Sequence, residues 1–443
     1  MIGGSAMRKV IKASVVLTMN KAAEVYKPGY VIVDGNRIVE VGKGEPKLGP
    51  DDELVDFTGK LLMPGLINAH AHTPMVLTRG MCEGVSLFTM DGFLNTLRRF
   101  EKYADSDMAA MTSPCNLAEM IRMGTTCFAD QYFYADRIFK ATDEAGLRGL
   151  ICYGIVELGD EEARKRETAR CEAFLEMCQR HPFIRGWVGP HAFFVDNSLD
   201  LIEIEKNLAK KYNTGFHIHF ATSNEENDYC MAHYNKSAVT MMKELGILEV
   251  PILAAHAITV SKEDMETMKG FPFTPVMAPT SSMKSGFPAA PVKAYRDHGI
   301  NVALGTDNLC SSSADMFGEM ATGAKLIIHR EHDVKAITAF DMVKMATIDG
   351  AKAIMMEDQL GSLENGKLAD MIALDLSDPG WVPFCGQDYY TQLVYWVSGM
   401  SVTDSMVNGR FLMRDRKLLT IDYGKVASDV EKATAELKRR MGE

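Results

Sequence analysis

The chain has 443 residues, of which 47% are hydrophobic and 24% charged, so it is long enough for one large domain and a smaller one. Its formal net charge of −11 argues against a nucleic-acid backbone as its main partner. No apolar run reaches the length of a membrane span, and the N-terminus lacks the hydrophobic region of a signal peptide. We therefore expect no membrane partner and a cytoplasmic location.

The nine cysteines form no C-x-x-C pair. This excludes most cysteine-based zinc sites and the signature of the small zinc deaminases that act on bases in nucleic acids. The odd number of cysteines, scattered without a pairing rhythm, indicates free thiols in a reducing compartment.

The N-terminal part of the chain reads as β structure. Residues 10–56 contain short β-branched runs, and Asp34-Gly35-Asn36 is a strong hairpin turn. No helical pattern interrupts this part. We assign residues 1–58 to the first half of a small β-sandwich.

From Leu61 onwards the pattern changes to strand, loop and helix, repeated. Eight apolar runs without alternation suit parallel strands buried on both faces: Leu61–Asn68, Thr125–Tyr132, Arg148–Val156, Ile184–Pro190, Gly215–Phe220, Pro251–Ala255, Phe273–Ala278 and Asn301–Thr306. Helical patterns lie between them, for example at Met108–Met123, Asp136–Ala145, Glu161–Gln179 and Leu199–Tyr212. The α/β pattern predicts a (β/α)₈ barrel over residues 59–358. A doubly wound open sheet is the alternative, weakened because no G-x-G-x-x-G follows an early strand.

After a helical stretch at Ala339–Met356, the β character returns. The expected strands are Lys367–Leu376, Leu393–Val397, Thr403–Val407 and Gly409–Arg414, with Asn408-Gly409 as a hairpin turn. An amphipathic helix over Val426–Met441 ends the chain. We assign residues 359–443 to the second half of the sandwich, which we expect beside the barrel.

The first barrel strand ends in two histidines, His70 and His72. Side chains alternate across a strand, so these two imidazoles point the same way and can hold one metal ion. A bare H-x-H arises readily by chance. Matching residues at the ends of later strands make chance a poor explanation here.

Ionisable residues recur at the ends of further strands, which meet on one face of a barrel. These residues are His191, His217, His219, His256 and Asp307. We interpret His217 as a core histidine. Imidazoles with a carboxylate bind zinc or a similar divalent ion, which turns water into a nucleophile at neutral pH. A neighbouring aspartate can take the proton of that water, so the pattern predicts metal-assisted hydrolysis.

Several longer motifs make the resemblance to a known family specific. They are MPGLINAHAH, TPMVLTRG, MIRMGTTCFADQYF, GPH, HIHF, AAH, LGTDN, MATIDGAKA and GSLENGKLADMIALD. With these motifs, over nearly its whole length, the chain resembles the amidohydrolase superfamily. Within the superfamily it is most similar to the branch of methylthioadenosine/S-adenosylhomocysteine deaminases and triazine chlorohydrolases.

The resemblance implies a role for each matching residue. His70, His72, His219 and Asp307 would be metal ligands, and Asp307 would also transfer protons. His256 would bind the metal or the attacked group and its water, and His191 would contact the substrate. The metal would be zinc by default, with iron as the alternative.

Two further positions have two interpretations each. Glu101 lies about where relatives bind ribose hydroxyls, but it could equally belong to a solvated helix face. We interpret Arg79 as a loop anchor rather than a substrate contact.

The sequence departs from the family at two places. Deaminases of this branch carry a glutamate three residues after the histidine of strand five, where this chain has Thr222. A threonine hydroxyl in the substrate pocket can donate a hydrogen bond but is no acid or base near neutral pH. Glu225 or Glu226 would have to reach back to replace the glutamate. At strand seven, Met277 stands where relatives have a histidine.

Three functions follow from these observations. The first is an aminohydrolase that releases ammonia from an adenosine derivative of the methylthioadenosine type or a related purine. The second is a hydrolase of another heterocycle with a different leaving group, as in chlorohydrolases, which Thr222 and Met277 favour somewhat. The third is a metal-containing binding protein that has lost the chemistry, against which the complete ligand set argues. In all three the partner is a small molecule. Because homo-oligomers are common among the relatives, a homo-oligomer is also possible here by analogy.

Overall fold

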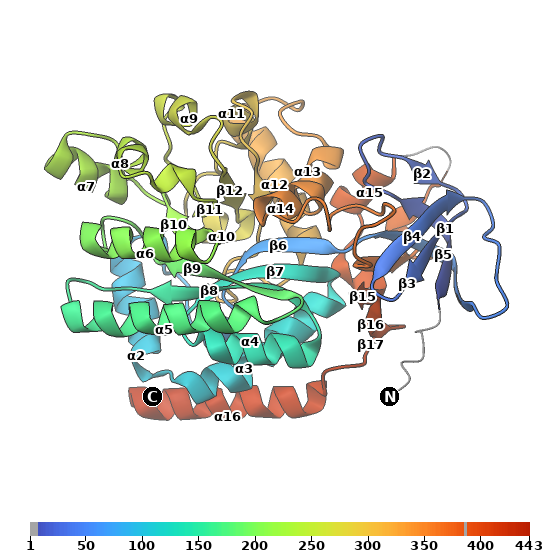
Figure 1. The fold of residues 1–443 in the computed structure, drawn as a ribbon, viewed down its shortest axis with the longest axis horizontal. Helices are drawn as coiled ribbons and strands as arrows, with labels where there is room; N and C mark the ends of the chain where they lie inside the picture. Colours follow the sequence, from blue (N-terminus) through green and yellow to red (C-terminus); the bar gives the residue numbers. More distant parts are fainter. Residues whose placement is uncertain (1–7, 385–387) are drawn as a thin grey trace.

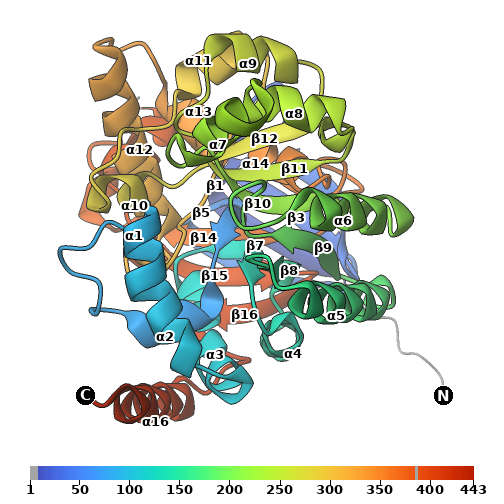
Figure 2. The same cartoon turned by 90° about the vertical axis from the view of Figure 1, so that its left-hand side faces the viewer.

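The computed structural model describes residues 8–384 and 388–443, and its centre is a barrel of eight parallel strands in sequential order (Figures 1 and 2). The barrel strands are β6 (Leu66–Ala71), β7 (Thr125–Tyr132), β8 (Arg148–Ile155), β9 (Ile184–Pro190), β10 (Phe216–Phe220), β11 (Ile252–His256), β12 (Phe273–Met277) and β13 (Ala303–Leu304). They are almost entirely buried on both faces, which explains their continuous apolar sequences. The predicted α/β barrel is confirmed.

Backbone hydrogen bonds join the first barrel strand to the segment after the last one. The amides of Thr306 and Asp307 donate to the carbonyl oxygen of His70 over 3.1 and 2.9 Å. Ala71 and Asp307 also form a parallel β-bridge. Because this closure falls at the carboxyl ends of the strands, it brings His70 and Asp307 together from opposite ends of the barrel sequence.

Helices surround the barrel, as Figure 2 shows from one end. Their bounds are α1 (Met90–Gly92), α2 (Arg98–Tyr103), α3 (Ser106–Arg122), α4 (Ala135–Ala145), α5 (Glu161–Gln179), α6 (Leu199–Lys211), α7 (Glu225–Tyr234), α8 (Ala238–Glu244), α9 (Lys262–Met268), α10 (Pro279–Lys284), α11 (Val292–Asp297), α12 (Met316–Glu331), α13 (Ala339–Met345), α14 (Ile348–Ala353), α15 (Tyr389–Tyr395) and α16 (Tyr423–Met441). A 3₁₀ turn at Thr73–Thr78 and a π-helical segment at Phe93–Leu97 follow β6, and further 3₁₀ turns occupy Ile247–Glu249, Pro379–Trp381 and Gly399–Ser401. No helix in the described ranges is long and apolar enough to cross a bilayer.

Strands from both ends of the chain form a second, mixed sheet beside the barrel (Figure 1). The strands are β1 (Lys9–Leu17), β2 (Val25–Tyr26), β3 (Gly29–Asp34), β4 (Arg37–Lys43), β5 (Glu53–Pro64), β14 (Met371–Asp375), β15 (Val402–Val407), β16 (Arg410–Arg414) and β17 (Lys417–Leu418). The sheet is curled. Two strands separate β5 from β16, yet the ring centroids of Phe57 in β5 and Phe411 in β16 lie only 6.2 Å apart. The predicted union of the two chain ends is therefore confirmed. The domain boundaries at 58/59 and 358/359 stay predictions.

The two predicted hairpin turns meet in this sheet. The side-chain amide of Asn36 donates to the side-chain oxygen of Asn408 over 3.1 Å, and Ala369 bonds both turns through its backbone. A side-chain hydrogen bond thus joins two turns whose residues lie 372 positions apart in the chain.

One expected strand is wrong, because Leu393–Val397 falls largely in helix α15. The run is rich in aromatic and branched residues, which favours a strand by propensity. The Asp388 carboxylate instead caps the helix by accepting from the amides of Tyr390 and Thr391, over 3.3 and 3.1 Å. Tyr390 then packs against Phe340 in α13 with ring centroids 4.8 Å apart, so tertiary packing and the cap outweigh propensity.

Two other predictions need adjusted bounds. The run from Leu61 to Asn68 is divided at Gly65, because β5 belongs to the terminal sheet up to Pro64 and the barrel strand β6 begins at Leu66. The stretch Ala339–Met356 is likewise two short helices, α13 and α14. The helix at the chain end is present as α16 and packs along α3 (Figure 1).

Candidate active site

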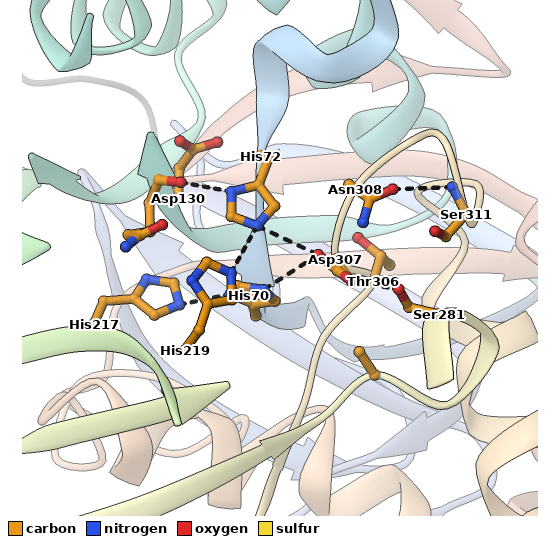
Figure 3. A network of polar contacts seen from close by, with 12 residues as sticks. His70, His72, Asp130, His217, His219, Ser281, Thr306, Asp307, Asn308 and Ser311 are labelled. Carbon is orange, nitrogen blue, oxygen red and sulfur yellow. Dashed lines mark hydrogen bonds and ion pairs between the residues drawn. The ribbon is translucent and has the colours of Figure 1, made fainter. Parts of the chain in front are cut away.

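The histidines predicted at the strand ends converge in the barrel, as Figure 3 shows for His70, His72, His217 and His219. The ring centroid of His70 lies 4.7 Å from that of His72, 5.2 Å from that of His219 and 5.4 Å from that of His256. Asp307 joins them, with its Oδ1 3.3 Å from the Nε2 atoms of both His70 and His72. Two groups of three side chains are spaced for one metal ion: His70, His72 and His219, and His70, His256 and Asp307.

The hydrogen bonds of these imidazoles orient their lone pairs towards one another. His72 bonds through Nδ1 to the carbonyl oxygen of Gln131 over 2.5 Å, and His219 bonds through Nδ1 to that of His191 over 3.2 Å. A carbonyl oxygen only accepts, so both Nδ1 atoms carry the proton. The two bare Nε2 atoms therefore face each other at 3.3 Å. Two lone pairs at this distance repel unless a cation lies between them, so the residues present fit a divalent metal.

His217 contacts the metal-ligand candidate His70, in addition to being the core histidine that the sequence predicted. Its Nε2 lies 2.8 Å from Nδ1 of His70, and the ring is fully buried in β10. This contact leaves Nε2 of His70, which has no hydrogen-bond partner among the described residues, directed at Asp307. His217 is a core histidine, as interpreted, and it also orients His70.

Asp307 is held from two sides. The hydroxyl of Ser281, in α10, donates to its Oδ2, and the backbone of Asp307 has a positive φ of 61°. Burial opposes the charge of Asp307, but the close approach of its carboxylate to the imidazoles of His70 and His72 outweighs burial and holds the pKa of Asp307 well below its usual range. A left-handed backbone at a non-glycine residue is uncommon and costs free energy, which the surrounding contacts of Asp307 must offset.

His256 also ends its strand in a left-handed conformation, with φ of 73°. Burial lowers the pKa of His256 to about 3, so the ring is neutral at physiological pH. Burial likewise lowers the pKa of His219 well below its usual value. Neutral imidazoles are the protonation state that a metal ligand requires.

A cavity of about 110 Å³ opens on this cluster and is lined by His72, His191, His219, His256 and Asp307. Aromatic side chains form much of its remaining wall. The ring of Phe93 stacks on His191 with centroids 4.5 Å apart, and the ring of Phe88 lies 4.3 Å from that of His256. Flat apolar walls beside a polar floor suit a planar heterocycle.

The remaining predicted substrate contacts lie on the wall of the same cavity. His191 bonds through Nδ1 to the carboxylate of Asp196, while Glu101 in α2 pairs with Arg98 over 2.8 Å. The Glu101 side chain is only 13% exposed, so it does not belong to a solvated helix face. Thr222 lines the cavity after β10, and so does Glu226.

Four other residues either lie outside the cavity wall or were not foreseen from the sequence. Arg79 pairs with Glu119 over 2.6 Å, and Glu119 in turn accepts from the amide of Ala314, so Arg79 anchors two loops. Sequence reasoning missed Ser281, whose only signal was its place in the motif after strand seven. It also missed Phe88 and Phe93, for which the loop sequence carried no signal.

Comparison with known proteins identifies the family. The model of the amidohydrolase family matches residues 61–412, which include every metal-ligand candidate. The chain belongs to the amidohydrolase family.

This amidohydrolase is similar to named proteins over its whole length. It is 34% identical to the 5-methylthioadenosine/S-adenosylhomocysteine deaminase of Thermoanaerobacter pseudethanolicus, with 98% of this chain and 100% of that protein covered. The crystal structure of an adenosine deaminase from Xanthomonas campestris with bound zinc superimposes with a TM-score of 0.92 at 26% identity, over 99% of this chain and 100% of that one.

The fold is shared with a chlorohydrolase as well. Atrazine chlorohydrolase from Arthrobacter aurescens, complexed with zinc, superimposes with a TM-score of 0.87 at 21% identity, over 96% of this chain and 100% of that one. The predicted family and branch are thus confirmed, with deaminases and a triazine enzyme both among the similar proteins.

Proposed function

We propose that this amidohydrolase is a metal-dependent aminohydrolase that releases ammonia from an adenosine derivative, of the methylthioadenosine or S-adenosylhomocysteine type, or from a related purine. The observation that carries the proposal is the convergence of His70, His72, His219 and Asp307 at metal-ligand spacing in a chain that matches named deaminases from end to end. The chain is a hydrolase of the amidohydrolase family with a site suited to a divalent metal, whichever substrate it takes.

In this proposal His70, His72, His219 and Asp307 hold the cation, as the facing lone pairs of their ligand atoms support. When bound, such a cation lowers the pKa of a coordinated water towards neutrality. We propose zinc rather than iron, on the nitrogen-rich ligand set and on the zinc named for the Xanthomonas campestris enzyme.

Protons would move through Asp307 and His256. Asp307 takes the proton of the attacking water and delivers it to the departing amino group. Ser281 fixes one Asp307 oxygen, so the other keeps its orientation towards His70 and His72. His256 is neutral and directs its ring at the cavity, where it can bond the attacked carbon's new oxygen.

The purine would lie between the aromatic walls. His191, oriented by Asp196, and Thr222 offer polar contacts to the base, and Glu101 can accept hydrogen bonds from ribose hydroxyls. A small molecule is the only partner this cavity requires. We also propose a homo-oligomer and a cytoplasmic location. The eight described cysteines are free thiols, which supports a reducing compartment.

The test is ammonia release from a panel of adenosine and guanine derivatives. Turnover of at least one adenosine derivative, with kcat/KM in the range of 10⁴ M⁻¹s⁻¹ or above, roughly the lower bound for ordinary enzymes, is expected. Hydrolysis of a heterocycle without ammonia release would favour the second candidate, a hydrolase with another leaving group. Thr222 and Met277 support that candidate, because both replace polar groups that family deaminases carry.

Removal of the metal separates a catalyst from a binding protein. Elemental analysis should find about one zinc per chain, and a chelator should abolish turnover, with recovery on adding zinc back. Activity that survives complete removal of the metal would contradict the proposed chemistry. Iron in stoichiometric amount, with full activity, would correct the metal and leave the mechanism in place.

A further inference from the structure

We propose that Glu226 supplies the acid that Thr222 cannot, by donating its carboxyl proton to a ring nitrogen of the substrate. The inference rests on the proposed aminohydrolase function and names one more residue of that site. In family deaminases the corresponding glutamate follows the histidine of strand five by three residues, which is the position of Thr222 here.

The position of Glu226 supports this role. It lies in the first turn of α7, is 5% exposed, and lines the same cavity as His219, His256 and Asp307. Its Oε1 accepts a hydrogen bond from the amide of Ala221 over 3.2 Å. Ala221 directly precedes Thr222, so the carboxyl group returns to the strand end where the missing glutamate would begin.

The loop between β10 and α7 is fixed in this arrangement. Ala221 has a positive φ of 48°, which costs free energy at a non-glycine residue. Its carbonyl oxygen accepts from the amides of Ile258 and Thr259 over 2.8 and 2.9 Å, and the Thr259 hydroxyl donates to Ser223 O over 2.5 Å. These bonds tie the loop to the end of β11, so Glu226 is held in place before substrate binds.

Glu226 also holds a proton at neutral pH. Burial raises the pKa of Glu226 to about 8, and the nearby carboxylates of Asp196 and Glu225 act in the same direction, while hydrogen bonds from its own amide and that of Ala221 oppose them. Cys230, one turn further along α7, is a further titratable neighbour. A neutral carboxylic acid can donate a hydrogen bond and then a proton.

Two other acidic groups near the site are already engaged. Glu319 is buried, but its oxygens accept from the Ser312 hydroxyl and the amide of Thr280 over 2.6 and 3.0 Å. Asp196 is bonded to His191. Neither is therefore available as a proton donor to the substrate.

The proton balance of the step closes. Water adds to the amino-bearing carbon while Asp307 takes one of its protons and Glu226 protonates the ring nitrogen, whose double bond to that carbon opens. The carbon–nitrogen bond to the amino group then breaks, and Asp307 passes its proton to the leaving ammonia. The hydroxyl proton on the carbon-bound oxygen returns through solvent to Glu226 as the carbonyl forms. Both carboxyl groups end in their starting states.

Three variants test the proposal: Glu226→Gln, the double variant Thr222→Glu/Glu226→Gln, and Asp228→Asn as a control at an exposed carboxylate of the same helix. With the metal content unchanged, Glu226→Gln should lower kcat by about two to four orders of magnitude with little change in KM. The double variant should recover much of this loss, and the control should match the wild type. Wild-type kcat should fall as the pH rises through about 8, because the acid loses its proton, and Glu226→Gln should lack this limb. Undiminished kcat in Glu226→Gln would overturn the proposal.

A binding measurement separates this inference from the proposed function. Purine riboside carries the ring nitrogen and lacks the amino group, whereas 1-deazapurine riboside lacks that nitrogen. In the wild type the loss of the nitrogen should weaken binding by a further factor of about two to ten relative to Glu226→Met, whose side chain of similar length cannot donate a hydrogen bond. Equal ratios in both proteins would overturn the role of Glu226, whether or not the wild type releases ammonia. Absence of ammonia release with the expected ratio would overturn only the proposed reaction.

Discussion

At the scale of single residues, the site depends on side chains whose second contacts fix their orientation. His72 bonds Gln131, His219 bonds the carbonyl of His191, and Asp307 bonds Ser281. Each of these contacts leaves one ligand atom directed at the common centre. The sequence identified the ligand candidates by residue type, but the contacts that orient His72 and His219 come from main-chain carbonyls, which carry no sequence signal.

The first prediction concerns Asp307. Replacement by asparagine keeps the size and one oxygen but removes the negative charge and the capacity to take a proton. Asp307→Asn should lower kcat for ammonia release by about two to four orders of magnitude or more, to below the limit of detection. Circular dichroism and thermal melting should remain close to the wild type. Undiminished turnover would contradict the assignment of Asp307 as the proton-transfer base.

At the scale of secondary-structure elements, the parallel strands were predicted closely because they are buried on both faces. Strands β7 and β9 have the predicted bounds. Two elements were decided by their surroundings. α15 forms where propensity favours a strand, because Asp388 caps it and Tyr390 packs on α13. The break at Gly65 separates two sheets within one apolar run that nothing in the local sequence divides.

The second prediction follows from the alternation of side chains along β10. His217 and His219 project to the same side of the strand, so His217 lies behind the metal ligands and bonds His70 over 2.8 Å. His217→Gln should weaken metal affinity by about 10- to 100-fold, since it loosens the orientation of a ligand. Metal titration with a competing chelator measures this. His181→Gln, at a histidine on the surface paired with Asp143, serves as the control and should bind metal like the wild type.

At the scale of the whole molecule, the barrel and the terminal sheet are joined by a buried ion pair. Arg148, at the start of β8, donates to the carboxylate of Asp370 over 2.7 and 3.0 Å, and both side chains are almost inaccessible. Asp370 also accepts from the amide of Asn408 over 2.8 Å. This contact connects the sheet built from both chain ends to the scaffold that carries the site.

The third prediction therefore concerns stability rather than activity. Arg148→Met leaves the Asp370 carboxylate buried without its cation, which should lower the free energy of unfolding by about 3–5 kcal/mol. The double variant Arg148→Met/Asp370→Leu should recover part of this loss, because no uncompensated charge remains. Urea denaturation measures both. A double variant less stable than Arg148→Met would contradict the explanation by an unpaired charge.

The sequence by itself determined the barrel, the union of the chain ends and the ligand candidates. Continuous apolar runs indicate strands buried on both faces, and the carboxyl ends of the strands in a parallel barrel meet on one face regardless of loop conformation. Tertiary structure alone decided that Glu101 lines the cavity, that Ser281 holds Asp307 and that Glu226 returns to Ala221. These outcomes depend on loop conformation and on contacts between residues far apart in the chain, which local sequence patterns do not encode.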